Sequence, residues 1–144
     1  AGKVMAGNAS LWGSAVFRKY WTLAGGAHLR LANGSQAEIL SAVPPVDSWG
    51  SLSFHHLFFQ NDLDATMKIF FQFLGRTEFD VAGTSPWSAF RVRQPVFLLH
   101  LYGYFNVADV RFFVSFENIL DNSYFLLPGY RAPGRRFRYG LVWD

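Results

Sequence analysis

The sequence predicts an all-β fold: an antiparallel portion of a transmembrane β-barrel, with about seven up-and-down strands. Apolar and polar residues alternate in runs along the chain, as they do in strands with one face in lipid. The residues are 51% hydrophobic and 19% aromatic but only 16% charged, whereas soluble domains carry about 25% charged residues. No apolar run reaches about 18 residues, which excludes a membrane-spanning helix and leaves a barrel as the way to cross a bilayer.

Alternation places the first four strands at residues 7–17, 21–32, 50–59 and 64–74. Residues 18–20 and 60–62 are short connections, whereas residues 33–49 form a long polar stretch. That stretch holds Pro44 and Pro45, and two adjacent prolines cannot lie in a central ladder, so we expect a loop.

The remaining strands are expected at residues 95–105, 110–116 and 137–143, after a long loop at 75–94. Residues 106–109 are a short connection and the loop around residues 122–134 is long, so short and long connections alternate, as in transmembrane barrels. Seven strands are too few and of the wrong parity for a bacterial single-chain barrel. We therefore expect the sheet to be completed by strands of another chain or segment, since unpaired backbone groups are costly in lipid.

Motifs in the last third of the chain, together with one upstream motif, carry a resemblance to a known family. Asn118 and Asp121 follow a strand, with Tyr124 close behind; the further motif residues are Pro128, Gly129, Pro133, Gly134 and Arg135 downstream and Val43, Pro44 and Pro45 upstream. In this order they resemble the C-terminal end of TonB-dependent outer-membrane receptors, although Ile119 and Leu120 replace the family's usual Leu and Phe. The resemblance covers most of residues 12–144, as the C-terminal third of such a receptor.

The resemblance implies a function in the outer membrane of a Gram-negative-type bacterium, surrounded by lipid and lipopolysaccharide. The family takes up scarce nutrients of the siderophore, cobalamin or glycan class. Residues 1–144 would form the C-terminal portion of the barrel, and we find no plug domain in them. The plug and the remaining strands would belong to another chain or segment, and TonB would be contacted only through that plug. The alternative is a receptor-like barrel that serves as a structural platform for surface proteins, without transport.

The final strand resembles the signal that the barrel-assembly machinery reads during biogenesis. The residues concerned are Phe137, Tyr139, Gly140, Leu141 and Trp143. The usual pattern would add an apolar residue at position 145, whereas the sequence stops at Asp144. The other interpretation is an ordinary alternating strand.

Polar residues at alternate strand positions are expected to face the barrel lumen. They are His28, Arg30, His55, Lys68, Gln72, His100, Tyr102, Arg136 and Arg138. Arg136 and Arg138 could attract an anionic ligand, and Arg131 and Arg135 could pair with lipopolysaccharide phosphates at the outer rim; all four could equally be plain solvated charges.

Enzymatic, metal and nucleic-acid functions are not expected. His55 and His56 are adjacent, so in a strand they point to opposite faces, and no Cys or spaced carboxylate completes a metal site. No cofactor motif is found, and the scattered basic residues carry no nucleic-acid docking motif. A soluble lipocalin-like barrel is a third interpretation, but it would need a polar exterior, whereas the outward faces predicted from the sequence are rich in Phe, Leu, Ile and Trp.

Aromatic residues expected near strand ends, as in interfacial girdles, are Tyr20, Trp21, Trp49, Tyr102, Tyr104, Tyr130 and Trp143.

Overall fold

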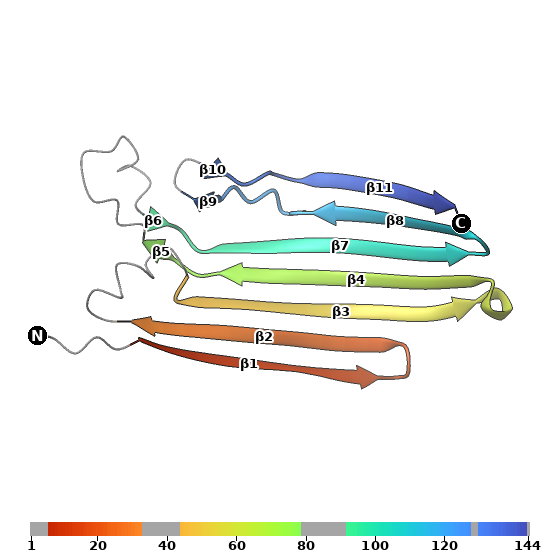
Figure 1. Ribbon diagram of the computed structural model, residues 1–144, viewed down its shortest axis with the longest axis horizontal. Helices are drawn as coiled ribbons and strands as arrows, with labels where there is room; N and C mark the ends of the chain where they lie inside the picture. Colours follow the sequence, from red (N-terminus) through yellow and green to blue (C-terminus); the bar gives the residue numbers. More distant parts are fainter. Residues whose placement is uncertain (1–5, 33–43, 79–91, 128–129, 144) are drawn as a thin grey trace, which may run out of the picture.

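The computed structural model is an all-β protein built on one open, single-layer antiparallel sheet (Figure 1). It describes residues 6–32, 44–78, 92–127 and 130–143. The sheet has seven strands in the order β1-β2-β3-β4-β7-β8-β11. Their bounds are Ala6–Phe17 (β1), Trp21–Ala32 (β2), Val46–Phe58 (β3), Leu63–Leu74 (β4), Val96–Val107 (β7), Val110–Glu117 (β8) and Arg136–Trp143 (β11). All seven predicted strands are present, and the expectation that they do not close into a barrel is confirmed.

The two ends of the sheet differ. At the turn end the connections are short: residues 18–20, 108–109 and 59–62, the last containing the 3-10 turn Phe59–Asn61 (η1). At the opposite, loop end, the long connections include two small ladders, β5 (Thr77–Glu78) with β6 (Val92–Arg93) and β9 (Phe125–Leu127) with β10 (Tyr130–Arg131). In Figure 1 both ladders lie at the left, where β1 begins, and β11 ends at the right. No described helix is long and apolar enough to span a membrane.

Strand register divides the sheet into two chemically distinct faces. One register row crosses all seven strands through Ala15, Leu23, Leu52, Ile69, Leu101, Phe116 and Phe137; we call its side the apolar face. The neighbouring row runs through Val16, Thr22, Ser53, Lys68, Tyr102, Ser115 and Arg138, and its side is the polar face. Because successive residues of a strand point to opposite sides, these two rows define the face of every other strand residue.

All charged residues of the seven strands lie on the polar face. They are Arg30, Asp47, Asp64, Lys68, Arg111, Glu117, Arg136 and Arg138. The apolar face carries no Asp, Glu, Lys or Arg within these strands, and it remains uncovered: Leu23 is 51% exposed and Ile69 44%. No second layer packs on it in the described part of the chain, so its apolar side chains meet whatever surrounds the protein.

The start of β3 corrects one prediction. The sequence predicts residues 46–49 as the end of a long polar loop, because they follow two adjacent prolines and include Asp47. The structure instead begins β3 at Val46 and pairs Val46 with Leu29. Asp47 is compatible with a strand because its carboxylate bonds Arg30 on the polar face. The prolines end the loop without entering the ladder, and the carbonyl of Pro45 accepts the Arg30 N–H at 2.7 Å.

Aromatic side chains gather on the apolar face at the turn end. Trp21 lies 4.9 Å from Phe54 and 6.3 Å from Phe17 between ring centroids, and the chain of contacts continues through Tyr20, His56 and Phe58. We call Phe17, Tyr20, Trp21, Phe54, His56 and Phe58 the turn-end aromatic cluster. Trp143 is the last residue of β11, as expected, but Tyr102 lies near the middle of β7 because that strand runs on to Val107. Tyr102 is therefore not a strand-end residue.

Three glycines occupy adjacent register positions on the apolar face. Gly13 pairs with Gly25, and Gly25 pairs with Gly50, so the first three strands share a row without side chains. The ring of Phe71 covers Gly50, and a Cβ there would lie 2.2 Å from that ring. Large rings often cover strand glycines in this way.

We expect Gly75→Ala to be more destabilising than Gly50→Ala. A Cβ at the buried Gly75 would lie 2.6 Å from the backbone oxygen of Val46, which cannot move without disturbing β3. At Gly50 only the ring of Phe71 must turn away. Urea titration should show a loss of about 1–2 kcal/mol for Gly75→Ala and about 1 kcal/mol or less for Gly50→Ala. Equal losses would contradict the view that backbone contact sets the cost.

Candidate functional site

The largest charged cluster of the polar face lies on β8 and β11. The carboxylate of Glu117 accepts from Arg136 at 2.9 Å and from Arg138 at 3.0 Å. Glu117 is mostly buried, with 18% of its side chain exposed, whereas the two arginines are about half exposed. Two guanidinium groups share one carboxylate, so the cluster keeps a net positive charge and unused N–H donors that face outward from the sheet. Such a cluster suits an anionic or multiply hydroxylated ligand.

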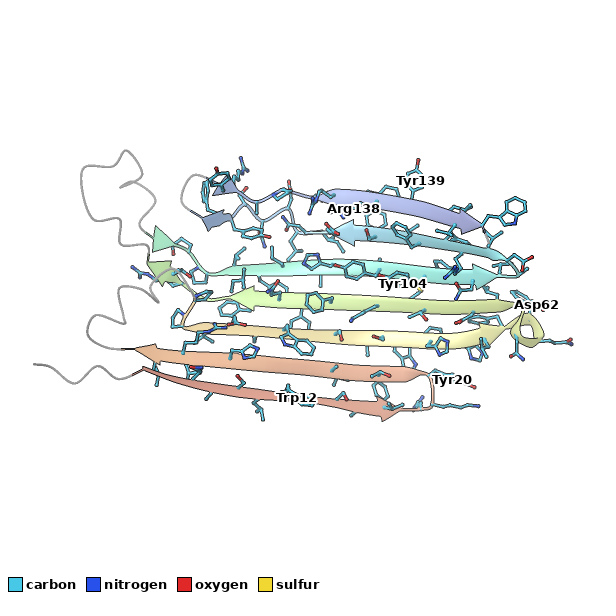
Figure 2. All side chains as sticks on the ribbon, viewed as in Figure 1. Trp12, Tyr20, Asp62, Tyr104, Arg138 and Tyr139 are labelled. Atoms are coloured by element: carbon cyan, nitrogen blue, oxygen red, sulfur yellow. The ribbon has the colours of Figure 1, made fainter. Side chains whose placement is uncertain are left out.

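Aromatic and imidazole groups lie beside this cluster on β7. His100 and Tyr102 are stacked with 6.2 Å between ring centroids, and the ring of Phe70 lies 5.8 Å from His100. Tyr102 pairs in register with Ser115, which pairs with Arg138 (labelled in Figure 2). The middle of the polar face therefore presents flat rings next to cations, a combination that binds planar or ring-shaped polar ligands by stacking and hydrogen bonding.

A second polar group lies near the loop end of β2 and β3. Arg30 donates to the Asp47 carboxylate at 2.5 Å and to the Pro44 carbonyl at 3.1 Å. On the neighbouring strand pair, the Ser10 hydroxyl and His28 Nδ1 are 2.8 Å apart. These contacts tie β1, β2 and the start of β3 together across the polar face.

A third group lies at the turn end. The Asp64 carboxylate lies between two partners: His55 Nε2 is 2.7 Å from one oxygen, and the Asn106 amide donates to the other at 3.3 Å. This links β3, β4 and β7 where the strands reach the short connections. His55 and Asn106 are exposed, and Asp64 is partly buried.

All nine polar residues predicted to face the lumen lie on the polar face. Register distributes them over its whole length: His28 and Arg30 near the loop end, His100 in the middle and His55 at the turn end. The histidines therefore do not converge, and no group of three metal-ligating side chains occurs among the described residues. Sequence reasoning missed Asp47, Asp64 and Glu117. Asp47 has the same strand parity as His55 in β3, and Asp64 the same as Lys68 in β4, whereas Glu117 lies one residue beyond the predicted strand 110–116, which contained no predicted lumen residue.

The motif residues Asn118 and Asp121 form a corner that joins the end of β8 to the start of β11. Asn118 is 4% exposed and has a left-handed backbone with φ 50°. Its side chain donates to the Asn122 carbonyl at 2.9 Å and accepts the Asn122 N–H at 3.1 Å. Asp121, with φ 55°, accepts the Arg135 N–H at 2.8 Å.

The corner also involves two other motif residues, Tyr124 and Gly134. A Cβ at Gly134 would lie 2.7 Å from Asp121 Oδ1, so glycine lets the loop come close to that carboxylate. The carbonyl of Tyr124 accepts the N–H of the buried Ala132 at 2.8 Å, which closes the β9–β10 ladder onto the corner. The motif spacing thus satisfies backbone groups, and its polar side chains hold a turn together. Val43, Pro128 and Gly129 lie outside the described residues.

The predicted assembly signal forms β11, the last strand of the sheet. Phe137, Tyr139, Leu141 and Trp143 lie on the apolar face and are strongly exposed, up to 77% for Trp143. Gly140 lies on the polar face beneath the ring of Phe113. Figure 2 labels Tyr139 next to Arg138, its neighbour on the opposite face.

Fold and site together define an all-β protein made of one open antiparallel sheet, with an uncharged apolar face and a polar face that carries the ion pairs. No protein-family model, curated protein or solved structure matches the chain.

Proposed function

We propose that this chain is part of the wall of an outer-membrane β-barrel, similar to the C-terminal part of a TonB-dependent receptor, and contributes to nutrient uptake. One observation carries the proposal: all charged residues of the seven sheet strands lie on one face, and the other face is apolar across all seven strands. A single layer with an apolar face needs a cover. Lipid would cover this face and would also account for the absence of charged residues on it, since a Lys or Arg at the bilayer midplane destabilises a barrel by about 2–4 kcal/mol.

The topology supports a barrel wall over a soluble sheet. Strands of 12 or 13 residues in β2, β3, β4 and β7 exceed the about 9–11 residues that a tilted strand needs to cross a bilayer. Short turns at one end and long connections at the other follow the barrel pattern. In this arrangement the turn end lies in the periplasm and the ladders β5–β6 and β9–β10 lie outside the cell.

The free edges of β1 and β11 support completion by further strands. Both are outermost in the sheet order, so half of their backbone N–H and C=O groups face away from it. In a bilayer these groups must be paired, and a barrel of about 22 strands would supply the partners. The polar face would then line the lumen, with Arg136, Arg138 and Tyr102 available to a passing siderophore, cobalamin or glycan.

The test uses membranes of the cells that make the protein. The chain is expected to remain in the membrane after a urea wash and to migrate faster in electrophoresis when it has not been boiled. Intact-mass analysis and N-terminal sequencing should then find the strands and plug that complete the barrel, on this polypeptide or on a copurifying one. If the barrel is membrane-bound but has no plug, that result would favour the platform function over transport. A chain released by urea would refute the membrane wall altogether.

A further inference from the structure

A pocket of about 270 Å³ lies at the turn end of the sheet, where β3 extends beyond the first residue of β2. Trp21, the first residue of β2, pairs with Phe54, whereas β3 runs on to Phe58. The turn before β2 folds back over this projecting part, and the Tyr20 carbonyl accepts the His55 N–H at 2.9 Å. The resulting notch is lined by Lys19, Tyr20, His55, His56, Leu57 and Asn61. Figure 2 labels Tyr20, which lines the pocket, and Asp62, which follows the lining residue Asn61 in the β3–β4 connection.

The pocket combines cationic and neutral hydrogen-bond donors. Lys19 supplies an ammonium group, held over the Tyr20 ring at 5.7 Å, and Arg18 precedes it in the same turn. Asn61 offers an amide, and His56 offers an imidazole. These groups suit a phosphate, which takes charge-assisted hydrogen bonds from several directions.

The basic residues are kept in a strained backbone. Arg18 has φ 47° and Lys19 has φ 64°, a left-handed conformation that Asn and Gly adopt readily and long side chains do not. Non-glycine residues with positive φ are most often Asn, Asp or His. Left-handed φ values also occur at Phe59, Gln60 and Ala108 in the other two short turns, so this conformation is shared by the turns at this end of the sheet. In the turn before β2 it is adopted by two basic residues, one of which, Lys19, lines the pocket.

The pocket lies at the edge of β3 and is lined from both faces of the sheet: His55 and Leu57 lie on the polar face, whereas His56 lies on the apolar face. His56 lies on that face within the turn-end aromatic cluster, with ring centroids 4.4 Å from Tyr20 and 4.5 Å from Phe58 in edge-to-face contact. Trp21 and Phe54 continue the cluster along the sheet. A ligand whose polar head filled the pocket would therefore lay its tail on aromatic and aliphatic side chains.

We infer that this pocket binds the phosphate of a phospholipid headgroup, with the acyl chains along the apolar face. The inference rests on the proposed membrane wall and deepens it, because it assigns the turn end to a headgroup layer. Lys19 and His56 are the principal donors, and the aromatic cluster fixes the depth of the sheet at the interface.

Binding is tested with the full protein in a maltoside detergent, which contains no phosphorus. The probes are dihexanoyl-phosphatidylglycerol and, separately, inorganic phosphate, each titrated by calorimetry. Arg18→Asn/Lys19→Gly is expected to weaken lipid binding by about tenfold or more, and its thermal midpoint should rise because strain is relieved. His56→Phe keeps the ring contacts and should weaken lipid binding by about fivefold. Lys68→Gln, which removes a cation from the polar face, should leave binding unchanged.

Three outcomes would overturn the inference. One is equal lipid affinity in the wild type and the turn variant. Another is the same loss in Lys68→Gln, which would indicate an unspecific charge effect. The last is inorganic phosphate binding as tightly as the lipid, which would make the pocket a free-anion site. A urea-resistant membrane protein with unchanged lipid affinity would refute the pocket alone, whereas release by urea would refute the membrane wall.

Discussion

Exchanging Lys68 and Ile69 is expected to lower the free energy of unfolding in a lipid bilayer by about 2–4 kcal/mol. The two residues are neighbours in β4, and register places Lys68 on the polar face and Ile69 in the middle row of the apolar face. The variant Lys68→Ile/Ile69→Lys keeps composition and net charge and moves the charge by one position. Because strand side chains alternate, that step carries the ammonium group from a polar wall into hydrocarbon.

The measurement is urea unfolding of the protein in phospholipid vesicles, followed by loss of the fast-migrating form in electrophoresis. Lys68→Ile alone is the matched control, since it removes the charge from the polar face without moving it to the other, and we expect it to cost less than about 1 kcal/mol. If the exchange and the control behave alike, the apolar face does not lie in lipid.

Replacing Asn118 by alanine is the second change with a large expected effect. The side chain is almost fully buried and forms a reciprocal pair of hydrogen bonds with the backbone of Asn122. Alanine loses both bonds, leaves the Asn122 groups unsatisfied, and must adopt a φ of 50°. The combined cost is about 2–4 kcal/mol, measured by urea unfolding together with the rate of proteolysis at the corner.

Two comparisons separate the causes at the corner. Asn118→Gly keeps the backbone conformation and loses only the side chain, so its cost should fall below that of alanine. Asn106→Ala removes an exposed asparagine with one 3.3 Å contact to Asp64, and we expect a loss below about 0.5 kcal/mol. If Asn118→Ala were as mild as Asn106→Ala, the corner would not be a determinant of the fold.

Alternation in the sequence was sufficient to predict all seven strands and the face of every candidate lumen residue. It works because a strand has a side-chain period of two, so a pattern such as Lys68-Ile69 leaves little freedom in orientation. The start of β3 was missed because Asp47 looks like a loop residue until its partner Arg30, which is distant in sequence, is known. The pocket was missed for the same reason: Lys19, His56 and Asn61 meet only through the staggered ends of β2 and β3.

The row formed by Gly13, Gly25 and Gly50 has a consequence for the shape of the protein. A sheet bends most easily where facing side chains do not resist compression, and glycine rows provide such lines of weakness in curved sheets. The first three strands share such a line, whereas β4 carries Phe71 at the same register position. Curvature will therefore concentrate on the β1 side. A barrel that included this wall would have an oval cross-section there, tightest around β2.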